Sequence, residues 1–266
     1  MIHSWSENII DFTSYIDTYS KNFIGREWLF EELNQWLTES DQRYFIITGE
    51  PGIGKSAIAA QLARTYNPAA SHFCIGRQTE TIDPRTFAHC ISQQLQQRLD
   101  GFGKCIAEDI NIRVDGQANV QENNGQAFGV FIGSLNASSA QVVFTHSVIN
   151  PLKKLYNQGF EKQLVILVDS LDEARQHTGQ ENIVDLLANL VGLPPKVRFV
   201  LTSREDNTSL RNFEKHSTFY LLDANSQENR GDIRSYVQHQ LDASEYSEQL
   251  QRRLSAQKIR PQAFVN

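Results

Sequence analysis

A strand-like run followed by a glycine-rich loop constrains the fold more than any other stretch of this chain. Residues 44–64 read YFIITGEPGIGKSAIAAQLAR. The β-branched and aromatic residues at 44–47 favour a strand, and the alanine-rich stretch after Ser56 favours a helix. Between them, residues 49–56 match G-x-x-x-x-G-K-[ST] at every fixed position. Because strand, loop and helix occur in the required order, the sequence predicts a phosphate-binding loop rather than a chance glycine-rich turn.

Each residue type in this loop has a role in holding phosphate. Glycines allow backbone conformations closed to other residues, so that successive N–H groups turn inward and form a nest for the β-phosphate. Lys55 supplies a positive charge for the β- and γ-phosphates, and the Ser56 hydroxyl can complete a Mg²⁺ shell. The following helix directs the positive end of its dipole toward the phosphates. The predicted nucleotide-binding loop consists of Gly49, Glu50, Pro51, Gly52, Ile53, Gly54, Lys55, Ser56 and Ala57.

A second apolar run ends in a group of acids. Residues 164–168 are consecutive aliphatic residues, typical of a strand buried on both faces of a parallel sheet, and Asp169, Asp172 and Glu173 follow. An acid-rich helix start is the alternative, but the upstream phosphate loop favours a metal site. We expect Asp169 to bind Mg²⁺, directly or through water, and Asp172 or Glu173 to polarise the attacking water. The sequence leaves open which of these two acids does so.

Further strands are predicted at residues 71–75, 197–201 and 219–222. The strand at 197–201 ends in Thr-Ser-Arg, which would place Arg204 where its guanidinium meets the γ-phosphate. A solvated surface arginine is the alternative, and the position after an apparent metal-binding strand favours the functional role. The sequence therefore predicts an α/β fold of the P-loop NTPase type, ASCE/AAA-like, with three α/β/α layers and a five-stranded, mainly parallel sheet.

The segment at residues 101–141 differs in composition from the rest of the chain. Its apolar residues alternate around an Asn-Asn-Gly turn, which predicts a small β-hairpin or meander inserted into the larger domain. A sensing or self-association surface is the alternative, since exposed strand edges invite pairing. A helix is expected at about 142–157. We expect an N-terminal arm packed on the domain at 1–22, a P-loop domain at 23–241 and a C-terminal helical segment at 242–266.

Composition argues against several classes of function. A net charge of −6 and a pI near 5.7 argue against a mainly electrostatic grip on nucleic acid or on an anionic membrane. No apolar stretch approaches the roughly 20 residues of a membrane span, and no basic segment precedes an apolar core at the N-terminus. We therefore expect a cytoplasmic protein without membrane contact. Cys74, Cys90 and Cys105 lack C-x-x-C spacing, which favours inert thiols over a disulfide framework or a zinc site.

Five motifs, taken in order, resemble those of the NACHT group of STAND-class P-loop ATPases, the signal-transduction relatives of AAA+ proteins. FIGRE, which by itself predicts only a turn and a helix start, resembles the nucleotide-base motif. GEPGIGKS resembles the Walker A loop, and LVILVDSLDE resembles the Walker B form of this group. FVLTSRE resembles the sensor strand, and DIRSYVQHQL the helix that usually follows the last strand.

The resemblance implies a site, its cofactors and a class of activity. Phe23, Ile24, Gly25 and Arg26 are implied to contact the nucleotide base, and ATP or ADP with Mg²⁺ are the implied cofactors. The implied function is a slowly hydrolysing ATPase that acts as a nucleotide-dependent conformational or oligomerisation switch through self-association or partner protein domains. Two other classes stay open: another P-loop enzyme, such as a small-molecule kinase or an AAA+-type motor, and a nucleotide-binding interaction module that never hydrolyses.

The chain also departs from the NACHT pattern. In that group a small helical domain and a winged helix, with a Gly-x-Pro motif that helps to hold the nucleotide, normally follow the ATPase core. Here Gly-Leu-Pro at 192–194 precedes the sensor strand, so we do not assign it that role. The sequence is therefore expected to be either a fragment of a longer protein or a reduced, stand-alone ATPase domain.

Overall fold

The computed structural model describes residues 10–111, 139–205 and 210–243. The chain divides into two compact units. The first consists of Met1–Lys21 and Asp41–Leu221, and the second of Asn22–Ser40 and Leu222–Asn266.

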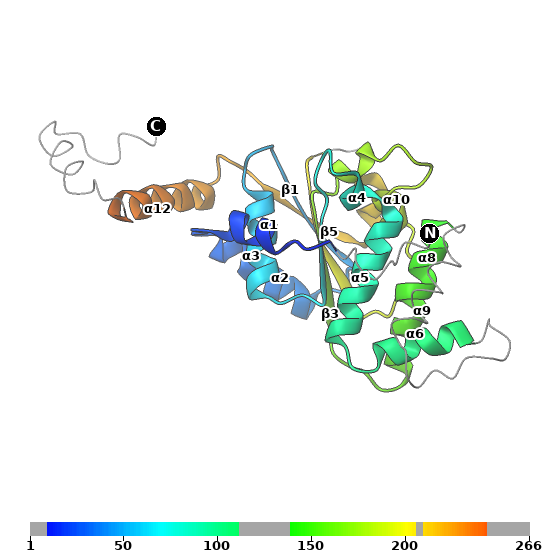
Figure 1. The fold of residues 1–266 in the computed structure, drawn as a ribbon. Coiled ribbons are helices and arrows are strands. Elements are labelled where there is room, and N and C mark those ends of the chain that lie inside the picture. Colours follow the sequence, from blue (N-terminus) through cyan, green and yellow to red (C-terminus); the bar gives the residue numbers. More distant parts are fainter. Residues whose placement is uncertain (1–9, 112–138, 206–209, 244–266) are drawn as a thin grey trace, which may run out of the picture. The chain divides into compact units, whose positions relative to one another are not determined.

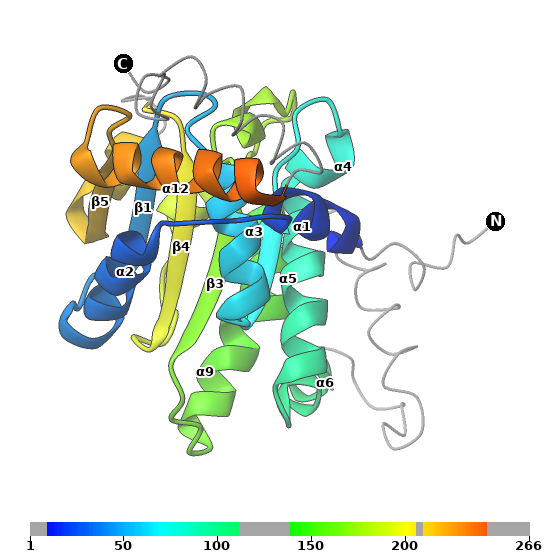
Figure 2. The ribbon, with the colours of Figure 1, turned by 90° about the vertical axis from the view of Figure 1, so that its left-hand side faces the viewer.

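The first unit is built on a five-stranded parallel sheet with the strand order β2-β3-β4-β1-β5 (Figure 2). The strands are β1 (Tyr44–Gly49), β2 (Ala70–Phe73), β3 (Leu164–Asp169), β4 (Val197–Ser203) and β5 (Ser217–Leu222). Strand β4 lies between β1 and β3, so that Phe199 is opposite Tyr44 on one side and Ile166 on the other. Because the carboxyl ends of parallel strands meet at one edge, this order brings together the glycine-rich loop, the acids after β3 and the polar end of β4.

Helices cover both faces of this sheet. They are α1 (Thr13–Ser20), α3 (Lys55–Thr65), α4 (Thr79–Ile82), α5 (Pro84–Arg98), α6 (Phe102–Asn111), α8 (Ala140–Phe144), the π-helix η2 (Thr145–Ile149), α9 (Asn150–Asn157), α10 (Ile183–Ala188) and the 3₁₀-helices η3 (Glu173–Gln176) and η4 (Arg211–His216). Figure 1 shows α1 and α3 on one face and α5, α6, α8, α9 and α10 on the other. The predicted three-layer α/β/α fold is therefore confirmed.

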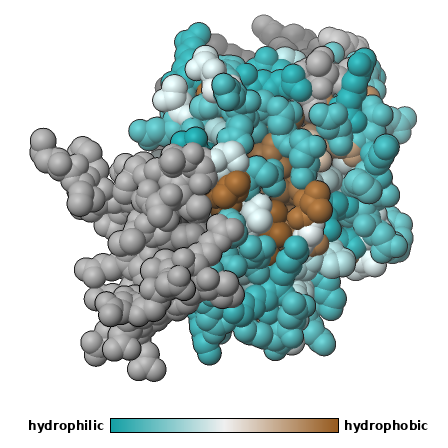
Figure 3. All heavy atoms as spheres, turned by 90° about the vertical axis from the view of Figure 1, so that its right-hand side faces the viewer, coloured by the Kyte–Doolittle hydropathy of each residue, from teal (hydrophilic) through white to brown (hydrophobic). Residues whose placement is uncertain are grey.

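The core is largest beneath the second group of helices. Phe87 on α5 and Phe144 on α8 are fully buried and stack with ring centroids 5.8 Å apart. The start of α5 follows the sequence rule for helix N-termini, because Asp83 Oδ1 accepts a hydrogen bond from Thr86 N at 2.7 Å and Pro84 occupies the first turn. On the outer side of these helices the described surface is largely hydrophilic, with hydrophobic atoms gathered near its centre (Figure 3).

A π-helical turn interrupts the helix that runs from α8 to α9. Pro151 in the first turn of α9 has no N–H to donate to the carbonyl of Ser147, four residues earlier. The hydroxyl of Ser92 on α5 donates to this carbonyl instead, at 2.8 Å in a buried position. The side chain of one helix thus donates to a backbone carbonyl of the other, at a position where the residue four along the chain is proline.

The inserted segment differs from its prediction. Residues 102–111 form α6, so the expected β-hairpin or meander is wrong for this part of 101–141. Phe102, Cys105 and Ile106 have the spacing of one helix face and are all buried, and burial of this face outweighs the two-residue alternation that predicted strands. Residues 112–138, with the predicted turn, lie outside the described residues. The next helix begins at Ala140 rather than at 142.

The second unit contains α2 (Glu27–Glu39) and α12 (Gln227–Ala243). Asp232 on α12 accepts hydrogen bonds from the backbone N of Arg26 at 3.2 Å and from Trp28 Nε1 at 3.0 Å. Gly25 has a φ of 81°, and a Cβ at this position would lie 2.4 Å from Asp232 Oδ1, so the contact requires glycine. Among the described helices of both units, none is long and apolar enough to cross a membrane.

Candidate functional site

The glycine-rich loop connects β1 to α3 and leaves open space above its backbone. Gly52 and Gly54 have φ values of 84° and 100°, in the left-handed region that favours glycine. Helix α3 begins at Lys55, with Gly54 as its N-terminal cap residue. Among the described residues, a Cβ at Gly52 would meet no atom within 4 Å. The loop and the first turn of α3 therefore form a cradle with N–H groups and a helix dipole at its base.

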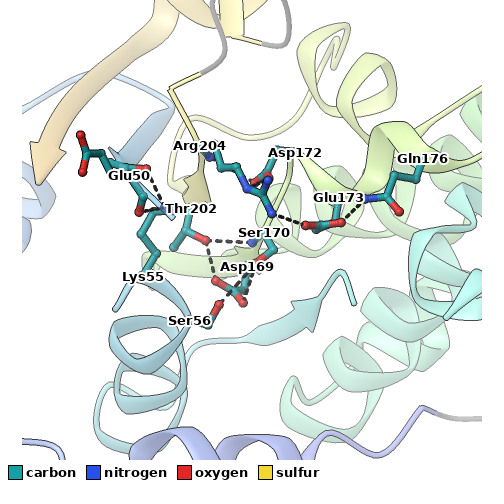
Figure 4. A network of polar contacts seen from close by, with 11 residues as sticks. Glu50, Lys55, Ser56, Asp169, Ser170, Asp172, Glu173, Gln176, Thr202 and Arg204 are labelled. Carbon is teal, nitrogen blue, oxygen red and sulfur yellow. Dashed lines mark hydrogen bonds and ion pairs between the residues drawn. The ribbon is translucent and has the colours of Figure 1, made fainter. Parts of the chain in front are cut away.

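The ammonium group of Lys55 rests on the carbonyls of its own loop. Lys55 Nζ donates to Gly49 O at 2.7 Å and to Glu50 O at 2.9 Å (Figure 4). Burial lowers the pKa of Lys55, and the negative charges of Asp172 and Asp169 oppose this effect. The ammonium group thus lies at the cradle, and its partners among the described residues are neutral carbonyls. A charged phosphate oxygen would take the place of these carbonyls.

Asp169, at the end of β3, is fully buried beneath a group of hydroxyls. Its Oδ1 accepts from Thr202 Oγ1 at 2.5 Å, and its Oδ2 accepts from Ser170 Oγ at 3.1 Å and from the Tyr15 hydroxyl at 3.3 Å. Burial raises the pKa of Asp169, and hydrogen bonds from these hydroxyls and from Ser56 oppose the rise. Its hydrogen-bond donors among the described residues are neutral hydroxyls, so that a bound cation would stabilise its charged form.

Thr202 aligns the ends of β3 and β4. Besides donating to Asp169, its Oγ1 accepts from the backbone N of Ser170 at 2.8 Å, and its carbonyl accepts from Leu171 N at 2.8 Å. Ser170 has a φ of 56°, uncommon for a residue with a side chain, and these bonds hold it there. The Oγ of Ser170 lies 3.4 Å from Ser56 Oγ. This contact places Ser56, in the first turn of α3, beside the end of β3.

Arg204 joins the two remaining acids in one network. Its Nε lies 2.9 Å from Asp172 Oδ2, its backbone N donates to Asp172 Oδ1 at 3.1 Å, and its Nη2 donates to Glu173 Oε1 at 2.8 Å. Gln176 Nε2 donates to the other oxygen of Glu173. The side chain of Arg204 is about half exposed, with a relative accessibility of 54%, whereas the two acids are mostly covered. Figure 4 shows this network beside Asp169 and Lys55.

These groups surround one cavity of about 550 Å³, within the range of ligand-binding pockets. Most of the predicted site residues line it: Pro51, Gly52, Gly54, Lys55, Ser56, Ala57, Asp172, Glu173 and Arg204. Asp169 lies beneath it, and the carbonyls of Gly49 and Glu50 hold Lys55. Ile53 closes the turn of the loop through its N–H to Glu50 O at 3.4 Å.

Four predicted site residues belong to the other compact unit. Phe23, Ile24, Gly25 and Arg26 belong to the second unit, where Asp232 contacts Arg26. Their contact with a nucleotide base therefore stays a prediction.

Several residues of the cavity were missed by the sequence motifs. Tyr15 and Tyr19 on α1 line the cavity, as does Gly76 after β2. A Cβ at Gly76 would lie 2.6 Å from Glu173 Oε2, so glycine leaves room for that carboxylate. Thr202 carried a signal, because it occupies the end of a strand next to the acid-bearing strand. The tyrosines carried none, since only the tertiary fold brings α1 to this edge of the sheet.

The donor set fits Mg²⁺ bound together with a nucleotide. Ser56 and Asp169 offer a hydroxyl and a carboxylate side by side, and Mg²⁺ takes oxygen ligands, keeps several waters and shares substrate phosphates. In the described part of the chain, no group of three or more His, Cys, Asp and Glu side chains could hold a metal. A magnesium site here would therefore depend on phosphate oxygens for its remaining ligands.

Comparison with known proteins identifies the family. No curated protein matches the chain significantly. A family model described as nephrocystin 3, N-terminal, matches residues 25–204. The match begins at Gly25 and ends at Arg204, so it includes the glycine-rich loop, the acids after β3 and the end of β4. Because it spans about two thirds of the sequence, the chain belongs to the nephrocystin 3, N-terminal family.

Proposed function

We propose that the protein is an ATP-binding, slowly hydrolysing NTPase module of the STAND-class NACHT group, which acts in the cytoplasm as a nucleotide-dependent conformational or oligomerisation switch. One observation carries the proposal. A glycine-rich cradle with Lys55 and Ser56 faces a buried acid, Asp169, and an arginine-bound pair of acids across a single cavity.

The cradle supports binding of the phosphates of ATP or ADP. The loop amides, the start of α3 and the Lys55 ammonium all present positive charge to the same space. Ser56 and Asp169 would hold the Mg²⁺ that accompanies the nucleotide, and this ion would neutralise charge on the β- and γ-phosphates. Thr202 and Ser170 keep Asp169 in position for that contact.

The acids and Arg204 support slow turnover. Asp172 or Glu173 would polarise the attacking water, and both carboxylates are paired with Arg204. The same pairing occupies the oxygens that would act on water. A γ-phosphate would compete for the guanidinium and release an acid, so hydrolysis would require a rearrangement.

The same competition supports a switch. ATP and ADP differ by the γ-phosphate, and Arg204 is a half-exposed positive charge that this group would attract. A switch requires that two arrangements of the protein differ in their affinity for the two nucleotides. In one arrangement Arg204 would be bound to the acids, and in the other to phosphate. Self-association or partner protein domains would then respond to the arrangement adopted.

A second candidate is a nucleotide-binding interaction module that never hydrolyses. The observation that favours it is the engagement of both acids by Arg204, which leaves neither carboxylate free to act on water. Turnover that appears when the protein is clustered would support the ATPase, whereas tight binding without turnover under any condition would support the interaction module.

The proposal is tested by nucleotide affinity, measured with fluorescent ATP and ADP analogues with and without Mg²⁺. Lys55→Ala should weaken binding by about 10- to 100-fold, since it removes a charge-assisted bond to phosphate. Lys162→Ala is the matched control, because Lys162 is exposed and lies outside this cavity. Failure of the folded wild type to bind either nucleotide would overturn the proposal, as would equal affinity in Lys55→Ala.

A further inference from the structure

Helix α1 is anchored over the cavity at both of its ends. At its start, the buried ring of Phe12 lies 5.2 Å from the ring of Phe73 at the end of β2. At its end, the buried Ser20 accepts a hydrogen bond from Arg64 in the last turn of α3, at 3.3 Å. Between these anchors, Tyr15 and Tyr19 line the cavity, and their rings are tilted by 32° with centroids 4.4 Å apart. The helix therefore forms one wall of the site, although no motif marks it.

Tyr15 is the one member of the Asp169 hydroxyl group that comes from outside the loop and the strand ends. Its hydroxyl donates to Asp169 Oδ2 at 3.3 Å, while its ring packs on Phe73 with centroids 5.0 Å apart. Burial and the charge of Asp169 raise the pKa of Tyr15, so the hydroxyl stays protonated and acts as a donor. It would not serve as an anionic metal ligand.

The hydrogen bond from Tyr15 occupies a lone pair of Asp169 Oδ2 that a metal would need. Each carboxylate oxygen accepts about two hydrogen bonds. Oδ2 of Asp169 already accepts from Ser170 and from Tyr15, and Ser170 Oγ is in turn next to Ser56 Oγ. A Mg²⁺ ion or its bound water placed between Ser56 and Asp169 would therefore compete with the Tyr15 hydroxyl for this oxygen.

We propose that Tyr15 is a positioning residue of the metal site, whose hydroxyl occupies Oδ2 of Asp169 and makes Mg²⁺ binding conditional on displacement of α1 or of the tyrosine itself. This role rests on the proposed nucleotide-binding function and adds to it a gate at Asp169.

The test compares Tyr15→Phe with the wild type. The variant keeps the ring contacts with Phe73 and Tyr19 and removes only the hydroxyl. Tyr156→Phe is the matched control, because its hydroxyl donates to the carbonyl of Lys162 outside the cavity. Affinity for a fluorescent ATP analogue is measured in EDTA and over a series of Mg²⁺ concentrations. We expect the half-saturating Mg²⁺ concentration to fall about tenfold in Tyr15→Phe, the value of one hydrogen bond to a charged group, and to be unchanged in Tyr156→Phe.

The other outcomes distinguish a failure of the gate from a failure of the proposed function. An unchanged or higher Mg²⁺ requirement in Tyr15→Phe, with nucleotide still bound in EDTA, would overturn the gate and leave the proposed function standing. Absence of nucleotide binding by the wild type would overturn the proposed function and the gate with it. Hydrogen exchange of the wild type gives an independent test without a variant: the amides of residues 13–20 should exchange faster with Mg²⁺ and a non-hydrolysable ATP analogue, and slower or unchanged exchange would contradict the gate.

Discussion

At the scale of single residues, hydroxyl groups rather than charges hold the central carboxylate. Asp169 is fully buried and accepts from Thr202, Ser170 and Tyr15, and the positive charges of Lys55 and Arg204 are bound to other partners. Burial of a carboxylate without a paired cation is costly, and hydrogen bonds from neutral groups offset only part of this cost. The site thus keeps a carboxylate in a state that a bound cation would stabilise.

Thr202→Val tests the hydroxyl that serves two partners. The variant keeps the volume but leaves Asp169 Oδ1 and the N–H of Ser170 without this partner, so we expect the free energy of unfolding to fall by about 1–3 kcal/mol. Mg²⁺-dependent nucleotide binding should weaken as well, because Asp169 loses its orientation. Urea denaturation measures the stability, and Thr202→Ser should restore most of it. Equal stability of the valine variant would show that Thr202 only fills space.

At the scale of elements, strand order decides which motifs meet. Strand β4 lies between β1 and β3, and its end supplies both Thr202 and Arg204 to the space between the phosphate loop and the acids. The sequence predicted the strands β1, β3 and β4 because each is a compact apolar run followed by polar residues. It did not predict α6, because the alternation of isoleucines near residue 110 obscured the helical spacing that begins at Phe102.

The π-helical turn gives a prediction at this scale. Ser92→Ala should reduce the free energy of unfolding by about 1–3 kcal/mol, since it removes a buried hydrogen bond to the carbonyl of Ser147. Pro151→Ala supplies a backbone N–H at the position that proline blocks. Ser92→Ala should therefore cost less in the Pro151→Ala background than in the wild type, as a double-mutant cycle measures. Additive effects would argue against this compensation.

At the scale of the whole molecule, the P-loop fold was predictable and the composition of the site was not. The fold followed from the loop of residues 49–56 and from buried strands that read directly as apolar runs. Tyr15 was not predictable, because its contact with Asp169 joins residues 154 positions apart and depends on how α1 packs against β2 and α3. Nor did the sequence indicate that Arg26 would contact Asp232 within a separate unit.

The stability of the whole molecule should fall in acid through His72. Burial lowers the pKa of His72 to about 4, below its ordinary value of 6.5, while its Nε2 bonds the carbonyl of Thr81 at 2.7 Å. The unfolded chain therefore takes up a proton at a higher pH than the folded chain does. The contribution of neutral His72 to the free energy of unfolding is complete above about pH 6.5. It is lost as the pH falls toward 4, by up to roughly 3 kcal/mol.

The measurement is urea denaturation at a series of pH values for the wild type and His72→Gln, which does not titrate and keeps a donor for Thr81. The pH dependence should be shallower in the variant. The difference between the two curves isolates His72, because His89, whose pKa burial also lowers to about 4, is common to both. The exposed His216→Gln is the control for loss of a histidine. Parallel curves for the wild type and His72→Gln would contradict the prediction.

The most direct test of a nucleotide site in this cavity is a crystal structure with Mg²⁺ and a non-hydrolysable ATP analogue. We predict phosphates in the cradle of residues 49–56, with Lys55 Nζ moved from the carbonyls of Gly49 and Glu50 onto phosphate oxygens. Mg²⁺ should lie beside Ser56 and Asp169, and Arg204 should leave at least one of its acids for the γ-phosphate. A nucleotide bound elsewhere, or a cradle that keeps its present contacts at saturating ligand, would contradict the account.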